Sequence, residues 1–356
     1  MNGSKFGFVM MLLVGIVPAL AGGIPLDAEH WNLENAELGE FLGRKAVTGR
    51  AILEKGELRD GVIQVDLAAT GERAYPGIIF HREGDRDYET LYVRPHKSNL
   101  PDAVQYAPAF NGMVGWQLFC GPGYTAKAVI PANKWNRMEI EIRGPKAIFS
   151  INGERVLEMP LKRGSQGGGM GLNAFPKNQA WFSNFRFTPA KPGKTEPVAT
   201  PEIASGTILN WQLSPILATE SLDTETYPAN LKTSEWQKVT GEAPGFLNIS
   251  RYLAKTQRWN TVMARAVVTA DRAKRVRLNL GYSDRLDLFV NGQKVFHGDS
   301  EFQARDETFL GIVGLNDAVY LDLKPGDNEI LAMISERFGG WAIWAKVDEL
   351  PSEAIR

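Results

Sequence analysis

The sequence has one cysteine, Cys120, in 356 residues. A single thiol cannot form an internal disulfide, so hydrophobic cores must hold the fold together. No catalytic motif surrounds Cys120, and we therefore expect a buried, unreactive thiol. The four histidines show no His-x-x-x-His spacing, and neither a Gly-x-Ser-x-Gly elbow nor a phosphate-binding loop is present. The sequence thus lacks the usual signatures of metal and nucleophile enzymes.

An excess of charge of either sign is also missing. The 40 basic and 41 acidic residues leave a net charge of −1. Nucleic acids and anionic membranes attract basic proteins, so we predict neither as a partner. Nothing indicates an organic cofactor. A structural calcium ion is left open, because irregular oxygen sites leave no spacing that a sequence can show.

Residues 1–21 predict a cleaved secretory signal. Lys5 supplies positive charge, Phe6 to Val17 form an apolar run, and Ala19-Leu20-Ala21 has the small-x-small cleavage pattern. The alternative is a membrane anchor, but this run is shorter than the ~20 apolar residues that span a bilayer. We expect a secreted or periplasmic protein that does not insert into the membrane after cleavage.

One pattern occurs twice: an apolar strand, an Asn-Gly pair and a second apolar strand. The pairs are Asn152-Gly153, within Ala147 to Leu157, and Asn291-Gly292, within Leu286 to Phe296. Asn-Gly favours the type I′ turn, whose twist matches that of the strands beside it. The repeat predicts β-hairpins in both halves of the chain.

Further alternating segments make the whole chain β-rich. They are Gly61–Leu67, Gly77–Phe80, Thr90–Val93, Arg137–Ile142, Trp181–Phe187, Thr261–Thr269, Arg275–Leu280, Arg285–Val290, Ala318–Leu323 and Asn328–Ser335. Turn-forming residues separate them, which favours sandwiches or jelly rolls. The predicted fold is all-β: a sandwich over 25–188, a proline-rich linker over 189–207 and a second sandwich over 208–350. Residues 211–244 either add edge strands or bridge the two sandwiches.

Both sandwiches resemble known families. Trp31 to Phe187 resembles concanavalin A-like, laminin G-like domains through Asp60-Gly61-Val62-Ile63-Gln64-Val65, Lys134-Trp135-Asn136-Arg137-Met138-Glu139-Ile140 and Phe182-Ser183-Asn184-Phe185. Leu247 to Val347 resembles galactose-binding-like jelly rolls through Asp287-Leu288-Phe289-Val290-Asn291-Gly292 and Leu323-Lys324-Pro325-Gly326-Asp327-Asn328. The strand Phe80-His81-Arg82 followed by Tyr88-Glu89 is similar to the 3-keto-disaccharide hydrolase domain family.

The segment from Asp87 to Trp116 holds the main candidate binding site. Alternation along a strand predicts that Tyr92, Arg94 and His96 share one face, where an aromatic ring and donors could hold a sugar. Gln105 and Trp116, on the following loop and strand, could close this groove. The alternative is a solvated polar face with an ion pair between Arg94 and Asp102.

Glu89 has the parity of the core-facing residues of the same strand. Burial would raise its pKa, as a general acid requires, so Glu89 and His96 are the catalytic candidates if the protein is an enzyme. The plainer alternative leaves Glu89 at the strand end, in water or paired with Arg82 or Arg86. The Glu-x-Asp-x-x-Glu signature of sandwich glucanases is absent, which argues against retaining glycosidase chemistry.

Three residues of the second half, Asp284, Arg305 and Trp341, are further candidate ligand contacts on loops at one end of the sandwich. The alternatives are an ion pair of Arg305 with Asp306 or Glu336, and a core position for Trp341 or Trp344. The leading hypothesis is an exported protein that binds an oligosaccharide or polysaccharide. A glycoside-cleaving enzyme and a protein-interaction or adhesion module remain alternatives.

Overall fold

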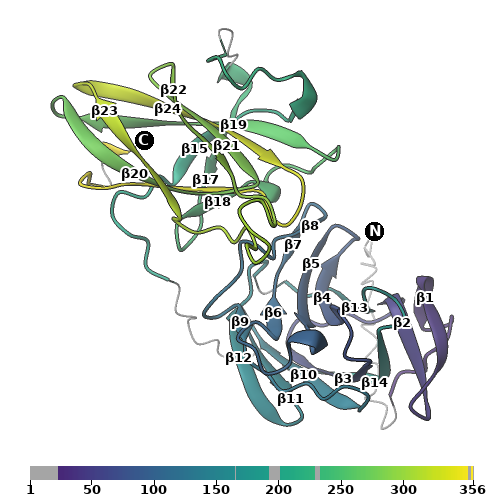
Figure 1. Ribbon diagram of the computed structural model, residues 1–356. Helices are drawn as coiled ribbons and strands as arrows, with labels where there is room; N and C mark the ends of the chain where they lie inside the picture. The colour runs from purple at the N-terminus through teal and green to yellow at the C-terminus, as the bar shows by residue number, and fades with distance from the viewer. Residues whose placement is uncertain (1–22, 165, 192–200, 229–232, 352–353, 356) are drawn as a thin grey trace, which may run out of the picture.

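The computed structural model describes residues 23–164, 166–191, 201–228, 233–351 and 354–355 (Figure 1). The predicted signal and the middle of the predicted linker lie outside these residues. The described chain is all-β, as predicted, with 25 strands, four short 3-10 helices and no α-helix among them. Within the same ranges, no helix is long and apolar enough to cross a membrane. Two β-sandwiches account for the strands (Figure 1).

The N-terminal sandwich is one continuous sheet that folds over its own core. Its strands are β1 (Trp31–Phe41), β2 (Arg44–Leu53), β3 (Gly61–Ala69), β4 (Gly77–Glu83), β5 (Asp87–Val93), β6 (Val104–Tyr106), β7 (Ala109–Phe110), β8 (Met113–Val114), β9 (Thr125–Ala126), β10 (Asn136–Arg143), β11 (Lys146–Ile151), β12 (Glu154–Pro160), β13 (Gly169–Asn173) and β14 (Ala180–Pro189). The main path runs β12-β11-β10-β3-β14-β2-β13-β4-β5-β6-β9. Its two end strands contact each other, so the sheet encloses one apolar core.

The C-terminal sandwich packs a seven-stranded sheet on a four-stranded one. The larger sheet contains β15 (Asn210–Leu213), β16 (Leu217–Ala218), β17 (Gln237–Thr240), β19 (Asn260–Ala270), β21 (Arg285–Val290), β22 (Gln293–Asp299) and β24 (Gly326–Glu336). The smaller contains β18 (Phe246–Asn248), β20 (Lys274–Ser283), β23 (Asp317–Leu323) and β25 (Ala342–Val347). Strand β17 forms an edge of the larger sheet, and β15 lies next to it. The segment 211–244 therefore adds edge strands, one of the two alternatives left open by its sequence.

The two Asn-Gly hairpins are confirmed. Asn152 and Gly153 have φ of 53° and 84°, and Asn291 and Gly292 have φ of 49° and 82°. Positive φ at both central residues is the mark of a type I′ turn. The turns join β11 to β12 and β21 to β22, one hairpin in each sandwich.

The two sandwiches are in direct contact through the loop that follows β8. Gln117 of this loop is fully buried and donates from its side-chain amide to the Leu310 carbonyl at 2.9 Å. Its backbone N–H donates to the Gly339 carbonyl at 3.0 Å, and its carbonyl accepts from the Val313 N–H at 2.9 Å. The Ser283 hydroxyl donates to the Gln117 side-chain oxygen at 3.2 Å. This glutamine is therefore hydrogen-bonded to several parts of the C-terminal sandwich.

Apolar contacts surround Gln117. Phe119 meets Phe246 edge-to-face with ring centroids 5.8 Å apart, and Phe246 in turn meets Trp344 at 6.4 Å. Phe246 and Val313 of the C-terminal sandwich belong to the same buried cluster as the N-terminal core. The interface is thus a continuation of that core, and it fixes how the two sandwiches sit relative to each other.

We expect Gln117→Ala to lower the free energy of unfolding by about 1–3 kcal/mol, because it removes a fully buried side chain that donates to the Leu310 carbonyl and accepts from the Ser283 hydroxyl. Chemical denaturation with fluorescence detection measures the change. Gln257→Ala, at an exposed side chain, is the control and should unfold like the wild type. Equal stability of the Gln117 and Gln257 variants would contradict the role assigned to Gln117.

Candidate functional site

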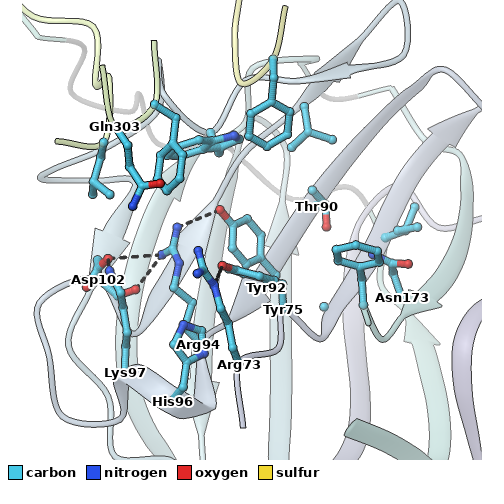
Figure 2. A pocket seen from close by; sticks show the side chains of 18 of the residues that line it. Arg73, Tyr75, Thr90, Tyr92, Arg94, His96, Lys97, Asp102, Asn173 and Gln303 are labelled. Carbon is cyan, nitrogen blue, oxygen red and sulfur yellow. Dashed lines mark hydrogen bonds and ion pairs between the residues drawn. The ribbon is translucent and has the colours of Figure 1, made fainter. Parts of the chain in front are cut away.

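A cavity of about 560 Å³ lies between the two sandwiches. Aromatic rings, charged groups and amides from both sandwiches line it (Figure 2). The residues that line it include Arg73, Tyr75, Tyr88, Thr90, Tyr92, Arg94, His96, Lys97, Asp102, Trp116, Asn173 and Phe175 from the N-terminal sandwich, and Phe302, Gln303, Glu307, Leu310 and Phe338 from the C-terminal one. Its size is within the usual range of small-molecule sites.

The floor of the cavity is the outer face of β4 and β5. Side chains alternate along β5, so Tyr88, Thr90 and Tyr92 line the cavity whereas Leu91 and Val93 enter the core. Strand β5 ends at Val93, and the chain turns into a 3-10 helix at Pro95–Lys97. The cavity therefore receives Arg94 and His96 from this turn rather than from a continued strand.

A hydrogen-bond network fixes the side chains at one end of the cavity. Arg94, only 7% exposed, donates from Nη2 to the Tyr92 hydroxyl at 3.0 Å and to the Gln105 side-chain oxygen. The Tyr92 hydroxyl donates to that same Gln105 oxygen at 2.7 Å. The Gln105 amide donates to the carbonyls of Trp116 at 2.7 Å and Phe119 at 2.6 Å. Burial also raises the pKa of Tyr92 well above its usual value, which keeps its hydroxyl protonated.

The ion pair weighed as an alternative is present as well. Arg94 Nη1 donates to the Asp102 carbonyl at 2.6 Å and lies 3.8 Å from its carboxylate. Lys97 is closer to that carboxylate, at 2.6 Å. The ion pair and the predicted grouping of Tyr92, Arg94 and His96 therefore coexist in one cluster at the cavity wall.

His96 faces the cavity as a neutral imidazole. Its Nδ1 accepts from the Ala74 backbone N–H at 3.4 Å, which favours the tautomer with the proton on Nε2. Desolvation lowers the pKa of His96, and the positive charges of Arg73, Lys97 and Arg94 lower it further. The Tyr75 ring lies edge-on to the imidazole with centroids 5.5 Å apart. His96 is thus an uncharged group able to exchange a proton or a hydrogen bond with a ligand.

The C-terminal sandwich supplies the opposite wall, which the sequence did not reveal. Trp116 lies at the boundary, with its ring 6.2 Å from Phe302 and 5.8 Å from Phe338. Gln303 lies across the cavity from Arg94 (Figure 2). Phe338 and Phe175 are 57% and 63% exposed although both are large apolar rings. Aromatic faces with this exposure at the edge of a cavity are available to a ligand.

Glu89 does not belong to this cavity. It is fully buried on the core side of β5 and accepts from the Tyr106 hydroxyl at 2.6 Å and the Arg163 N–H at 2.8 Å. Burial raises its pKa to about 7. The plainer alternative, with Glu89 in water or paired with Arg82 or Arg86, is therefore wrong. The structure also does not bring Glu89 and His96 together, so they cannot act as one acid–base pair.

The three candidates of the C-terminal sandwich have structural positions. Trp341 is fully buried and donates from its indole to the Ile334 carbonyl at 3.1 Å, so the ligand contact considered for it is wrong and its alternative, a core position, is confirmed. Arg305 pairs with Asp317, not with Asp306 or Glu336. Neither residue lines the cavity.

Asp284 is buried and acts on the cavity wall indirectly. Its carboxylate accepts from the backbone N–H groups of Arg337 at 2.8 Å and Phe338 at 3.2 Å. These bonds fix the turn that carries the exposed Phe338 ring. Asp284 is therefore a positioning residue for this wall rather than a ligand contact.

Neither a metal cluster nor a reactive thiol adds to the site. Among the described residues, no group of three or more His, Cys, Asp or Glu is arranged to hold a metal ion. Cys120 is half-buried, and desolvation raises the pKa of its thiol. The thiol is therefore protonated near neutral pH and is a weak nucleophile.

Residues 27–188 match the model of the 3-keto-alpha-glucoside-1,2-lyase-like domain family. This match confirms the family resemblance of the N-terminal sandwich. No curated protein matches the sequence. Similar solved structures include the carbohydrate-binding module CBM66 from Bacillus subtilis (18% identity, TM-score 0.36, covering 44% of this chain and 94% of that one). A putative glycosyl hydrolase from Parabacteroides distasonis (14%, 0.31, covering 46% and 95%) and galectin LEC-6 from Caenorhabditis elegans (12%, 0.32, covering 44% and 98%) are also similar.

The raised pKa of Glu89 predicts a pH-dependent stability. The fold favours the protonated carboxyl, so this contribution is complete below the unfolded pKa near 4.5 and is lost as the pH rises through about 7. Between pH 4.5 and 8, we expect the free energy of unfolding of the wild type to fall by about 3 kcal/mol more than that of Glu89→Gln, whose side chain cannot ionise. Urea denaturation across this range measures it. Glu154→Gln, at an exposed position, should follow the wild type; an unchanged pH profile in Glu89→Gln would overturn the assignment.

Proposed function

We propose that the protein is an exported carbohydrate-binding protein, and that the sugar occupies the cavity between the two sandwiches. The observation that carries the proposal is the combination of accessible aromatic rings with hydrogen-bonding groups that the fold already orients. Trp116, Phe175 and Phe338 offer the rings, and Arg94 and His96 offer donors. Export rests on the signal predicted for residues 1–21.

A sugar ring matches this combination chemically. One face of a pyranose carries C–H groups that pack on an aromatic ring, and its edge carries hydroxyls that need donors and acceptors. Tyr92 and Gln105 hold Arg94 in place before a ligand arrives, which reduces the entropy lost on binding. The match of residues 27–188 to a family named for action on a glucoside also supports a sugar ligand.

Phe338 is the sharpest test of this proposal. Its ring is 57% exposed, so Phe338→Ala removes cavity surface with little loss of core packing. We expect oligosaccharide affinity to fall about tenfold or more, the usual effect of removing an aromatic anchor. Equilibrium dialysis against an oligosaccharide library, read by mass spectrometry, identifies the ligand, and calorimetry then compares the variants.

Tyr320→Ala is the matched control, because this ring is 68% exposed and does not line the cavity. Equal affinity in the Phe338 and Tyr320 variants would exclude the cavity as the binding site. Arg94→Ala is a poorer test of binding, because the loss of a buried, hydrogen-bonded guanidinium also destabilises the fold.

The family match and His96 favour a second candidate, a lyase acting on a 3-keto-glucoside. The C2 proton of such a sugar is acidic because it is adjacent to the C3 carbonyl. A base that removes this proton allows a C1–C2 double bond to form while the C1–O bond breaks, and the departing oxygen takes up a proton. The neutral His96 imidazole that lines the cavity has the charge state that this base requires, and its unprotonated Nδ1 takes the proton after it gives up the long, 3.4 Å hydrogen bond from the Ala74 N–H. Glu89 has no part in this step because it lies on the core side of the strand.

If the protein is this lyase, it should release the aglycone from a 3-keto-α-glucoside, and His96→Gln should lower kcat at least a hundredfold. The wild-type rate should fall as the pH drops through the His96 pKa, which lies below its usual value near 6.5, because the protonated ring cannot accept a proton. Chromatography of the released aglycone measures the rate. His297→Gln, at an exposed histidine outside the cavity, should keep full activity; equal rates in both variants would exclude His96 as the base.

A further inference from the structure

The charges that line the cavity are unevenly distributed. Arg73, Arg94 and Lys97 gather with His96 at one end, on the N-terminal sandwich (Figure 2). The carboxylates that line the cavity are Asp102, at the same end, and Glu307, on the C-terminal wall.

One carboxylate serves two of these cations. Asp102 lies 2.6 Å from the Lys97 ammonium and 3.8 Å from the Arg94 guanidinium. Arg73 donates from Nε to the Tyr75 hydroxyl at 2.8 Å. Within the described residues, no carboxylate lies within ion-pair distance of Arg73. This end of the cavity therefore holds three cations against one carboxylate, an excess of two positive charges.

The neighbouring imidazole experiences this excess of positive charge. Arg73, Lys97 and Arg94 all act on His96 in the direction that disfavours its protonation, while Asp102 acts in the opposite direction. Three cations therefore lie close enough to His96 to affect one group. A negatively charged ligand atom placed beside His96 would be stabilised by the same cations.

On the proposed function, we infer that the bound sugar carries a negative charge, as in a uronic acid carboxylate or a sulfate ester, and that this group binds beside Arg73. A guanidinium presents parallel N–H donors that match the oxygens of either group. Arg73 is exposed, and its side chain makes one hydrogen bond to the part of the chain that the structure describes, so it has donors to spare. Neutral sugars would leave this charge without a partner.

Glu307 gives the ligand an orientation. It lines the wall contributed by the C-terminal sandwich, whereas Arg73 lines the N-terminal one. A carboxylate repels an anion and accepts hydrogen bonds from hydroxyls. The charged group of the sugar thus binds at the Arg73 end, and uncharged hydroxyls meet Glu307.

The test compares sugars that differ only in charge. Calorimetry with the whole protein uses trigalacturonic acid, its carboxyl-reduced counterpart galactotriose, and a sulfated galactotriose. We expect an anionic sugar to bind about tenfold tighter than galactotriose at low salt, the effect of one charge-assisted hydrogen bond. The preference should shrink at high salt because the charge is screened. The two anionic arms show whether the charged group is a carboxylate or a sulfate.

Three variants separate the charge of Arg73 from general effects. Arg73→Gln should remove the preference for the anionic sugar, lowering the affinity for the anionic sugars about tenfold more than the affinity for galactotriose. Glu307→Gln should strengthen anion binding. Arg143→Gln, an exposed arginine outside the cavity, should change neither.

Two failures are distinguishable. If galactotriose binds as tightly as both anionic sugars, or if Arg73→Gln keeps the preference, the inference about charge is overturned while carbohydrate binding stands. If neither these sugars nor any member of the oligosaccharide library binds, the proposed function itself fails, and the inference with it.

Discussion

The cavity depends on the close packing of the loop after β8 against the glycine pair Gly339-Gly340. A Cβ at Gly339 would lie 1.9 Å from the Gln117 side-chain oxygen, and one at Gly340 would lie 2.0 Å from a Leu118 methyl. Both glycines also have positive φ, which other residues rarely adopt. Only glycine at both positions allows the loop of one sandwich to lie against the other. Because Trp116 precedes Gln117 in this loop and Phe338 precedes the glycine pair, the same contact brings these two rings together.

Strand β5 separates two kinds of chemistry by alternation alone. The face with Thr90 and Tyr92 meets the cavity, and the face with Glu89 meets the core and the Tyr106 hydroxyl. A carboxyl with a pKa of about 7 is a usual candidate for a general acid, because shifted pKa values are common at active sites. Burial accounts for the raised pKa of Glu89, and Glu89 lies on the face of β5 that points away from the cavity. Here a shifted pKa therefore indicates a structural role.

The alternation of side chains predicted much of this architecture but only part of the site. The Asn-Gly hairpins and most core strands follow from local sequence, because turn geometry and period-2 burial are local properties. The grouping of Tyr92, Arg94 and Gln105 follows in part from parity. The far wall does not, because the bond from Gln117 to Leu310 spans 193 residues and depends on how two folded units meet. For Trp341, the sequence left a ligand contact and a core position open, and burial decides for the core.

Because the walls come from two sandwiches, ligand binding and docking of the sandwiches are linked. A sugar that contacts Arg73 on one wall and Phe338 on the other binds the docked arrangement more tightly than either wall alone. The difference between its affinities for the docked and the undocked arrangements therefore adds to the free energy of docking, because a ligand stabilises the state that it binds more tightly. Conversely, the hydrogen bonds of Gln117 hold the walls in place before the ligand arrives, so less binding energy is lost in ordering them. On the proposed function, the C-terminal sandwich thus contributes to affinity in two ways: Phe338 lines the site directly, and the hydrogen bonds of Gln117 hold that wall in place.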